Sequence, residues 1–287
     1  MSIKLIVTHP GSSHKDDLLA CCLLAHLHGV PIERREPADQ DLADPEICVV
    51  DVGSSHDAAL NNFDHHQFPK DGPPLCALSL VLQNLGLYED ALAFCEWLRP
   101  AEWLDTLGPV AAASKMGIGR EAFGQLMSPV DITLLRRFAD QTRLTAESPV
   151  YQVMLMIGED LIYYLKGLRA RLDYLREHCE FWTVSSEQGT VEAVFLERSE
   201  VSVDDPSFGL DQFVASVSQD REIVATVSPD RRGVGYGLTR YEDNLRVDFT
   251  RVKDCEDVRF VHRSGFVAKT DVTDQRRLKE LLAQAIV

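Results

Sequence analysis

Two short apolar runs near the N-terminus each end in a loop rich in polar side chains. The run IKLIVT (residues 3–8) is followed by HPGSSHKDD, and EICVVDVG (46–53) carries Asp51 at its end, before a Gly-Ser-Ser turn. Helical segments follow at residues 16–29 and 75–86, and each closes on a glycine. Buried strands that alternate with helices predict a parallel sheet, whose functional loops gather at the carboxyl ends of its strands.

The rest of the chain predicts a helical middle and a second domain. Residues 88–178 carry helical spacing with no competing strand signal. Strand-like segments follow residue 180, at 191–197, 222–228, 233–241, 245–250 and 258–262, and a last helix is expected near 274–286. We therefore predict an α/β fold with an N-terminal parallel-sheet domain and helical extension, residues 1–180, and a smaller C-terminal α+β domain, residues 186–287.

Composition favours a cytoplasmic globular protein. The 287 residues are 45% hydrophobic, enough for substantial cores. No charged leader precedes an apolar core, and no apolar stretch approaches the roughly 18 residues of a membrane span, so neither secretion nor a membrane partner is expected. The seven cysteines contain no Cys-x-x-Cys pair, which indicates buried, reduced thiols.

Charge is distributed unevenly along the chain. The net charge of -16 argues against a surface that binds nucleic acid all over. Residues 221–287, however, hold 13 Lys and Arg against 11 Asp and Glu, a balance of +2, which leaves -18 for residues 1–220. This division suits a metal centre in the first part and anion recognition in the second, although two ordinary surfaces would also explain it.

Potential metal ligands are concentrated near the N-terminus. Seven of the nine histidines lie within the first 66 residues. The loops after the two predicted strands carry His9, His14, Asp16, Asp51, Asp64, His65 and His66. Imidazole and carboxylate without a nearby thiolate suit Mn²⁺, with Mg²⁺ as the alternative, and two such ions about 3.5–4 Å apart would activate a water molecule for in-line attack on phosphorus.

Each of these residues also has a simpler interpretation. His26 and His28 lie within the predicted helix and are interpreted as surface or packing residues. His9 alone fits an ordinary loop, and Asp51 alone fits a carboxylate that caps a neighbouring helix. The combination, a histidine just past the first strand, a carboxylate ending a later strand and then Asp-His-His, favours a ligand cluster.

The order of these motifs resembles that of the DHH phosphoesterase superfamily and, within it, the Myg (melanocyte proliferating gene) family. The matching phrases are THPGSSHKDDLLA, VVDVGSS, FDHHQF, EWLDTLG and FVHRSGFVAKT, which span residues 8–270 in order. Most superfamily members begin with His-x-x-x-Asp-x-Asp, whereas this chain has His9-x-x-x-x-His14-x-Asp16, as in the Myg family. The Asp-Asn-Gly often found at the helical aspartate is Asp-Thr-Leu-Gly here. The resemblance implies a DHH-type catalytic domain.

The resemblance also implies roles for individual residues. The first metal ion would be held by His9, His14 and Asp51. The second would be held by Asp16, Asp51, His65 and Asp105, with Asp51 bridging the two ions. His66 would stabilise charge on the scissile phosphate, and Asp64 would orient a ligand imidazole. The sequence alone leaves open that Asp105 is an exposed helix residue beside Trp103.

The C-terminal phrase VHRSGFVAKT contains His262, Arg263, Gly265 and Lys269. The resemblance implies that this domain closes over the metal site and binds substrate phosphates through these residues. Spacing alone fits a strand, a turn and a second strand with surface cations. The nearby RRGVGYGLTR predicts a glycine-bearing hairpin rather than a dinucleotide loop, with Arg231, Arg232 and Arg240 as phosphate-facing candidates.

These features favour a metal-dependent phosphodiesterase. The resemblance points to 3′–5′ exonuclease action on single-stranded RNA or short oligonucleotides. A pyrophosphatase or small-nucleotide phosphoesterase has the same chemistry, and a catalytically silent nucleotide- or RNA-binding protein is the alternative of another class. The apolar residues between 151 and 168 fit either burial in the monomer or a homodimer face.

Overall fold

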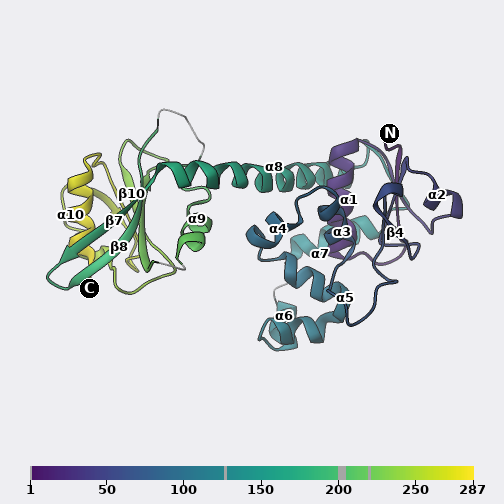
Figure 1. Ribbon diagram of the computed structural model, residues 1–287, viewed down its shortest axis with the longest axis horizontal. Helices are drawn as coiled ribbons and strands as arrows, with labels where there is room; N and C mark the ends of the chain where they lie inside the picture. Colours follow the sequence, from purple (N-terminus) through teal and green to yellow (C-terminus); the bar gives the residue numbers. More distant parts are fainter. Residues whose placement is uncertain (1, 126–127, 200–204, 219–220) are drawn as a thin grey trace. The chain divides into compact units, whose positions relative to one another are not determined.

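The computed structural model describes residues 2–125, 128–199, 205–218 and 221–287 (Figure 1). The chain forms two compact units, the first ending at Lys166 and the second beginning at Gly167. The division lies within helix α8 (Pro149–His178). The predicted fold class is confirmed, because a sheet with parallel strands comes first and a second, mostly antiparallel sheet follows.

The first unit is built on a six-stranded sheet. Its order is β4-β5-β3-β1-β2-β6. The four inner strands run parallel and are β1 (Leu5–Thr8), β2 (Ile32–Arg34), β3 (Ile47–Val50) and β5 (Asn62–Phe63). The edge strands β4 (His56–Asp57) and β6 (Arg143–Leu144) pair antiparallel. The prediction that residues 88–178 contain no strand was wrong at β6, a pair too short to show a periodic pattern.

Alternating side chains of the inner strands fill two separate cores. Ile6 of β1 packs into the large core with α1 (Lys15–His28) and α3 (Ala77–Asn84). Its neighbour Val7 points to the other face and packs with Val49 in a small core. Both faces of the sheet are therefore covered, which is why these strands read as continuous apolar runs.

The predicted helical middle consists of several separate helices. After α3 these are α4 (Tyr88–Phe94), α5 (Leu98–Lys115), α6 (Arg120–Gln125), α7 (Pro129–Ala139) and α8. Within α5 the backbone leaves helical geometry at Gly108, with φ of 79°, and Pro109 follows. Proline cannot donate the next helical hydrogen bond, so the helix breaks there, immediately after the turn that carries Asp105.

The apolar side chains of α8 divide into two sets. Met154, Ile162 and Leu165 are buried in the core of the first unit, whereas Met156 and Tyr163 are exposed. Burial thus explains much of the apolar content, and the homodimer stays a prediction. Among the described residues, no helix combines the length and apolarity needed to cross a membrane.

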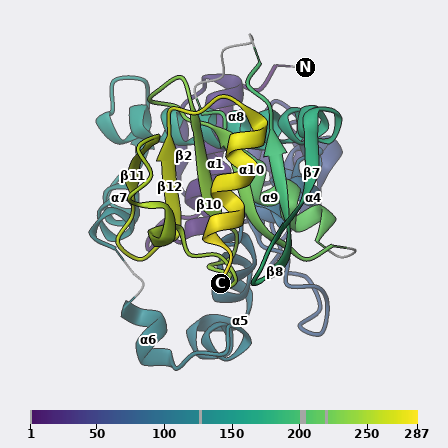
Figure 2. The same cartoon turned by 90° about the vertical axis from the view of Figure 1, so that its left-hand side faces the viewer.

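The second unit is an α+β structure around a sheet of order β11-β12-β10-β9-β8-β7. Its strands are β7 (Cys179–Ser186), β8 (Gly189–Leu196), β9 (Ile223–Pro229), β10 (Tyr236–Arg240), β11 (Val258–Val261) and β12 (Val267–Thr270). Helix α10 (Gln275–Ala285) crosses one face (Figure 2), and its Leu278, Leu281 and Leu282 are buried in the core. A short helix, α9 (Leu210–Val217), was not predicted.

One predicted strand of the second unit was wrong. Residues 245–250 form a turn that leads into a 3-10 helix, Phe249–Val252, instead of a strand. The carboxylate of Asp248 accepts hydrogen bonds from the amide and hydroxyl of Thr250, at 2.9 and 2.8 Å, and so starts the helical turn. A local side-chain cap therefore overrides the alternating apolar pattern.

Candidate metal centre

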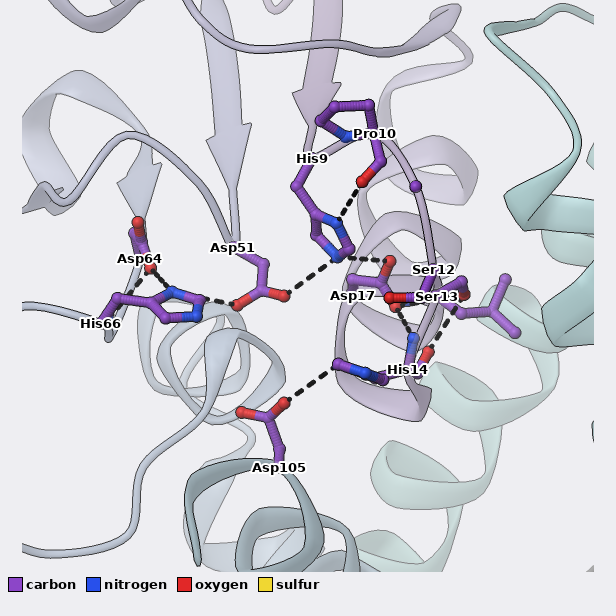
Figure 3. Close-up of polar contacts among 12 residues, drawn as sticks. His9, Pro10, Ser12, Ser13, His14, Asp17, Asp51, Asp64, His66 and Asp105 are labelled. Atoms are coloured by element: carbon purple, nitrogen blue, oxygen red, sulfur yellow. Dashed lines mark hydrogen bonds and ion pairs between the residues drawn. The ribbon is translucent and has the colours of Figure 1, made fainter. Parts of the chain in front are cut away.

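Strand register places three polar residues side by side at one edge of the first sheet. Thr8 of β1 lies opposite Val50 of β3, and Val50 lies opposite Phe63 of β5. The residues that follow these three are His9, Asp51 and Asp64. Because the strands are parallel, all three residues lie at the carboxyl edge of the sheet, where Figure 3 shows Asp51 facing His9 and Asp64 facing His66.

Asp51 lies at the centre of this group. One carboxylate oxygen, Oδ2, lies 3.4 Å from Nε2 of His9, and Oδ1 lies 3.2 Å from Nε2 of His65. The residue is buried and has a left-handed backbone, with φ of 58°. Its amide donates to the carbonyl of Phe63 at 3.1 Å, which holds this conformation. A left-handed conformation at a residue other than glycine is uncommon and concentrates at functional sites.

Four side chains from separate segments meet around this carboxylate. Asp16, Asp51, His65 and Asp105 each offer one ligand atom, and these atoms all lie within 4.8 Å of one another. Nε2 of His65 lies 2.9 Å from Oδ2 of Asp105. Asp16 lies in the first turn of α1, His65 follows β5 and Asp105 comes from α5, so only the folded chain assembles them.

Several buried polar atoms at this site make no regular hydrogen bond within the described part of the chain, although those of His9 and His65 lie at ion-pair distance from neighbouring carboxylates. They are His9 Nε2, both carboxylate oxygens of Asp16, Asp17 Oδ2, Asp51 Oδ1, His65 Nε2 and Asp105 Oδ2, and all are buried. Among the described residues, the two oxygens of Asp16 have neither a hydrogen bond nor an ion pair, and a buried carboxylate without a partner is costly, which points to a missing cation. Imidazole nitrogens and carboxylate oxygens are the ligands of Mn²⁺ and related divalent cations. The residues present therefore fit a metal centre.

The pKa shifts of the residues at the site also fit a metal centre. Burial, and then the neighbouring Asp51 and Asp105, raise the pKa of Asp16 well above its usual value. Contact with Asp17 raises the pKa of His9 to about 9. Burial opposes the charge on His65, but Asp105 and Asp51 outweigh it and raise its pKa to about 10. Protons thus compensate the crowded carboxylates, and a divalent cation would supply the same positive charge.

His14 is placed differently from His9. Its Nδ1 lies 3.4 Å from Oδ1 of Asp105, and its side chain is 57% exposed. The His9 and His14 ring centres are 6.2 Å apart. Of the residues predicted for the first metal ion, His9 thus contacts Asp51 directly, whereas the contact of His14 is with Asp105 (Figure 3).

Asp64 orients the imidazole of His66. Oδ1 of Asp64 accepts from Nδ1 of His66 at 2.7 Å and from its amide at 3.1 Å, and Oδ2 accepts from the amide of Ser54 at 2.6 Å. The ring that Asp64 orients is therefore that of His66, not that of the predicted ligand His65. Asp51, Asp64, His65 and His66 form a second group of ligand atoms within 4.8 Å of one another.

Asp105 is not an exposed helix residue. Its side chain is only 9% exposed, and His14 and His65 outweigh burial and lower its pKa. One turn earlier on α5, the buried carboxylate of Glu102 accepts from the hydroxyls of Ser79, at 2.7 Å, and Tyr88, at 2.8 Å. These bonds fix α5 against α3 and α4 and so fix the position of Asp105.

The residues predicted for phosphate binding lie together around the hairpin that joins β11 and β12. Nδ1 of His262 accepts from the amide of Ser264 at 3.2 Å. Gly265 has φ of 71°, and a Cβ there would collide with Asp248. Lys269 on β12 lies 3.5 Å from Asp230, and Arg263 is exposed in the turn. The glycine thus has a packing role, and the cation of Lys269 has an internal partner.

The glycine-bearing hairpin predicted at residues 231–240 is confirmed. β9 and β10 pair antiparallel across it. Gly237 lies opposite Lys269 of β12, whose side chain occupies the space that a Cβ at Gly237 would need. Arg240 is paired with Asp243 at 2.6 Å, so it is less available for phosphate than Arg231 and Arg232, which are exposed.

Sequence reasoning missed two residues that contact the centre or its loops. Oδ2 of Asp17 lies 3.2 Å from Nε2 of His9, and Oδ1 accepts from the amide of His14 at 2.8 Å. Arg34, the last residue of β2, donates to the backbone of the loop that joins these histidines. The pair Asp16-Asp17 was a visible signal, but β2 was too short to be predicted.

Comparison with known proteins gives a partial family match in the N-terminal part of the chain. Residues 5–71 match the family model MYG1_exonuc, described as "Uncharacterised protein family (UPF0160)". Neither the curated proteins nor the solved structures contain a match. The matched residues run from β1 to the loop after β5 and include every proposed ligand except Asp105. The match thus supports the Myg resemblance over the segment that carries most of the candidate metal centre.

Proposed function

We propose that the chain is a metal-dependent phosphodiesterase of the DHH superfamily that releases nucleotides from the 3′ end of single-stranded RNA or short oligonucleotides. The observation that carries the proposal is the set of buried imidazole and carboxylate atoms that converge around Asp51, among them both oxygens of Asp16, which have no partner among the described residues. The name of the family model matched by residues 5–71 supports exonuclease-like chemistry.

The residues around Asp51 would hold two divalent cations, with Mn²⁺ as the preferred ion. Asp16, His65 and Asp105 would hold one of them, His9 and His14 would contribute to the other, and Asp51 would be shared. When bound, such ions lower the pKa of a water molecule and neutralise charge on a phosphoryl group. Asp51 suits the shared position because its two oxygens face different imidazoles, at 3.4 and 3.2 Å.

His66 would contact the scissile phosphate. Its side chain is 60% exposed, unlike those of His9 and His65, and so it can reach a substrate. Asp64 accepts the hydrogen bond from Nδ1 of His66 and so holds the imidazole ring in one orientation. A donor held in place in this way stabilises negative charge as it develops in the transition state.

The β11–β12 turn forms a separate part of the proposal. His262, Arg263 and Lys269 would bind substrate phosphates, with Gly265 allowing the turn that holds them. Two neighbouring exposed arginines, Arg231 and Arg232, add positive charge to the same unit. The slight excess of Lys and Arg in residues 221–287 supports anion binding there.

The decisive experiment measures release of nucleotides from short single-stranded RNA with Mn²⁺ present or chelated. Wild type is compared with Asp51→Asn, which keeps the size of the side chain and removes its charge. Asp57→Asn is the matched control, because Asp57 is an exposed residue six positions further along the same segment. We expect Mn²⁺-dependent release by wild type and the control, and none by Asp51→Asn.

Three other outcomes would each contradict part of the proposal. If wild type binds Mn²⁺ but leaves RNA intact, the substrate assignment falls, and pyrophosphate and small nucleotides become the compounds to assay. If RNA binds equally well with chelator and is never cleaved, the chain is a silent binding protein. If wild type binds no divalent cation, the metal centre itself is rejected.

A further inference from the structure

Arg34 is a completely buried cation whose acceptors are backbone carbonyls. Its side chain is 1% exposed. Nη1 donates to the carbonyls of Gly11, at 3.1 Å, and Ala139, at 2.9 Å, and Nη2 donates to the carbonyl of Ser12, at 3.0 Å. A buried charge is tolerated only with such partners, so the position requires the planar fork of arginine.

The carbonyls of Gly11 and Ser12 belong to the loop that carries the candidate ligands His9 and His14. Gly11 has φ of 86°, which turns the chain sharply between the two histidines. Because Arg34 bonds the carbonyls of both Gly11 and Ser12, it fixes the middle of this loop. The ligands at the two ends of the loop therefore leave it in set directions.

The other acceptors lie at the end of α7. Phe138 and Ala139 are the last two residues of this helix, and Nη1 of Arg34 lies 3.3 and 2.9 Å from their carbonyl oxygens. The final carbonyls of a helix have no partner within the helix and carry partial negative charge, which a cation stabilises. The ring of Phe138 also lies 4.7 Å from Cζ of Arg34. The end of α7 thus anchors the guanidinium.

Asp17 links Arg34 to the ligands themselves. Its Oδ2 lies 3.7 Å from Nη2 of Arg34 and 3.2 Å from Nε2 of His9. Its Oδ1 accepts from the amide of His14 at 2.8 Å. The loop between the two histidines is thus fixed at its start, its middle and its end.

We propose that Arg34 is a positioning residue, which holds the 9–14 loop so that His9 and His14 can bind a divalent cation. The proposal rests on the metal centre of the proposed function, but not on the substrate. Residues that orient metal ligands change metal affinity by about 10- to 100-fold when they are replaced. The sequence position of Arg34 gives no hint of this role, because Arg34 ends β2, and the loop after β2 carries none of the candidate ligands.

The test is the affinity for Mn²⁺, measured by calorimetric titration of the whole chain. Arg34→Lys keeps the charge but loses the fork, so we expect Mn²⁺ to bind about 10-fold or more weakly. Arg171→Lys is the matched control. Arg171 is also buried, donates to the carbonyls of Pro206 and Phe208, and lies 4.7 Å from an aromatic ring, but it belongs to the second unit.

The outcomes separate positioning from a general effect on folding. Weaker Mn²⁺ binding by Arg34→Lys, with wild-type affinity for Arg171→Lys, supports the proposal even if no RNA is cleaved. Unchanged Mn²⁺ affinity in Arg34→Lys overturns it and leaves the proposed function intact. If Arg34→Lys does not fold, Arg34→Gln, which still donates two hydrogen bonds, replaces it. If both variants fail to fold while Arg171→Lys folds, Arg34 serves folding and the positioning role is rejected.

Discussion

Nε2 of His65 lies 2.9 Å from Oδ2 of Asp105 and thereby joins the loop after β5 to helix α5. Neither residue is near the other in sequence, and α5 packs against α3 and α4 through a different residue, Glu102. The contact shows that the candidate metal centre depends on packing in the helical part of the first unit as well as on the loops of the sheet.

Replacement of Asp16 by asparagine should impair metal binding without lowering the stability of the metal-free protein. Asp16 is 1% exposed and both of its oxygens lack partners, so loss of the carboxylate removes an unfavourable buried charge. In chelator, Asp16→Asn should melt at least as high as wild type. Excess Mn²⁺ should raise the melting temperature of wild type but not that of Asp16→Asn. An ion that binds only the folded state stabilises that state by about 2.7 kcal/mol when its concentration is 100 times Kd. A metal-induced rise in Asp16→Asn equal to that of wild type would exclude Asp16 as a ligand.

Glu102 should support both folding and the position of Asp105. Glu102→Ala leaves the buried hydroxyls of Ser79 and Tyr88 without their acceptor and should lower the free energy of unfolding by about 2–4 kcal/mol. Glu102→Gln is the matched variant, because both hydroxyls donate to the same oxygen, Oε1, which glutamine retains. Denaturant unfolding measures the loss. Equal destabilisation by the two variants would mean that the charge of Glu102, and not its hydrogen bonds, is what matters.

Gly265 should be required for packing rather than for binding of phosphate. Gly265→Ala combines a left-handed φ of 71° with a collision between the new Cβ and Asp248, so we expect a loss of about 2–4 kcal/mol. Gly29→Ala is the control for the backbone conformation, since Gly29 has φ of 67° and no atom within 4 Å of a Cβ, and should cost only about 1 kcal/mol. Thermal unfolding measures both. Similar losses would show that Asp248 moves aside at no cost.

The ion pair between Asp41 and Arg35 should make the protein less stable as the pH falls into the acid range. The carboxylate of Asp41 is 6% exposed and accepts from Nη1 of Arg35 at 2.7 Å, and this contact lowers its pKa. The stabilisation is complete above the unfolded-state pKa of about 4 and is lost as the pH falls through the lower pKa of the folded state.

Urea unfolding at pH 7 and at pH 3 tests this dependence. Asp41→Asn should cost about 1 kcal/mol at pH 7 and less at pH 3. Asp44→Asn is the control, because its partner Lys4 is exposed, and it should change stability little. A loss for Asp41→Asn that is the same at both pH values would show that the ion pair does not contribute.

Much of the candidate site was predictable because the apolar pattern that marks each strand lies within a few consecutive residues. Apolar runs at 3–8 and 46–53 predicted parallel strands, and His9 and Asp51 follow from where those strands end. The helical break after Asp105, at Gly108 and Pro109, was not predicted. Short elements such as β2 and β6 were missed, because two or three residues carry no measurable period.

The amino-acid sequence by itself determined which residue types would be available and at which strand ends they would stand. Only the tertiary structure decided that Asp17, the neighbour of the predicted ligand Asp16, faces His9 and Arg34, since successive helix residues point about 100° apart. It also decided that Asp64 orients His66 and that a buried arginine from β2 holds the 9–14 loop. These contacts join segments far apart in the chain, and burial in a shared core fixes their distances, which no local pattern specifies.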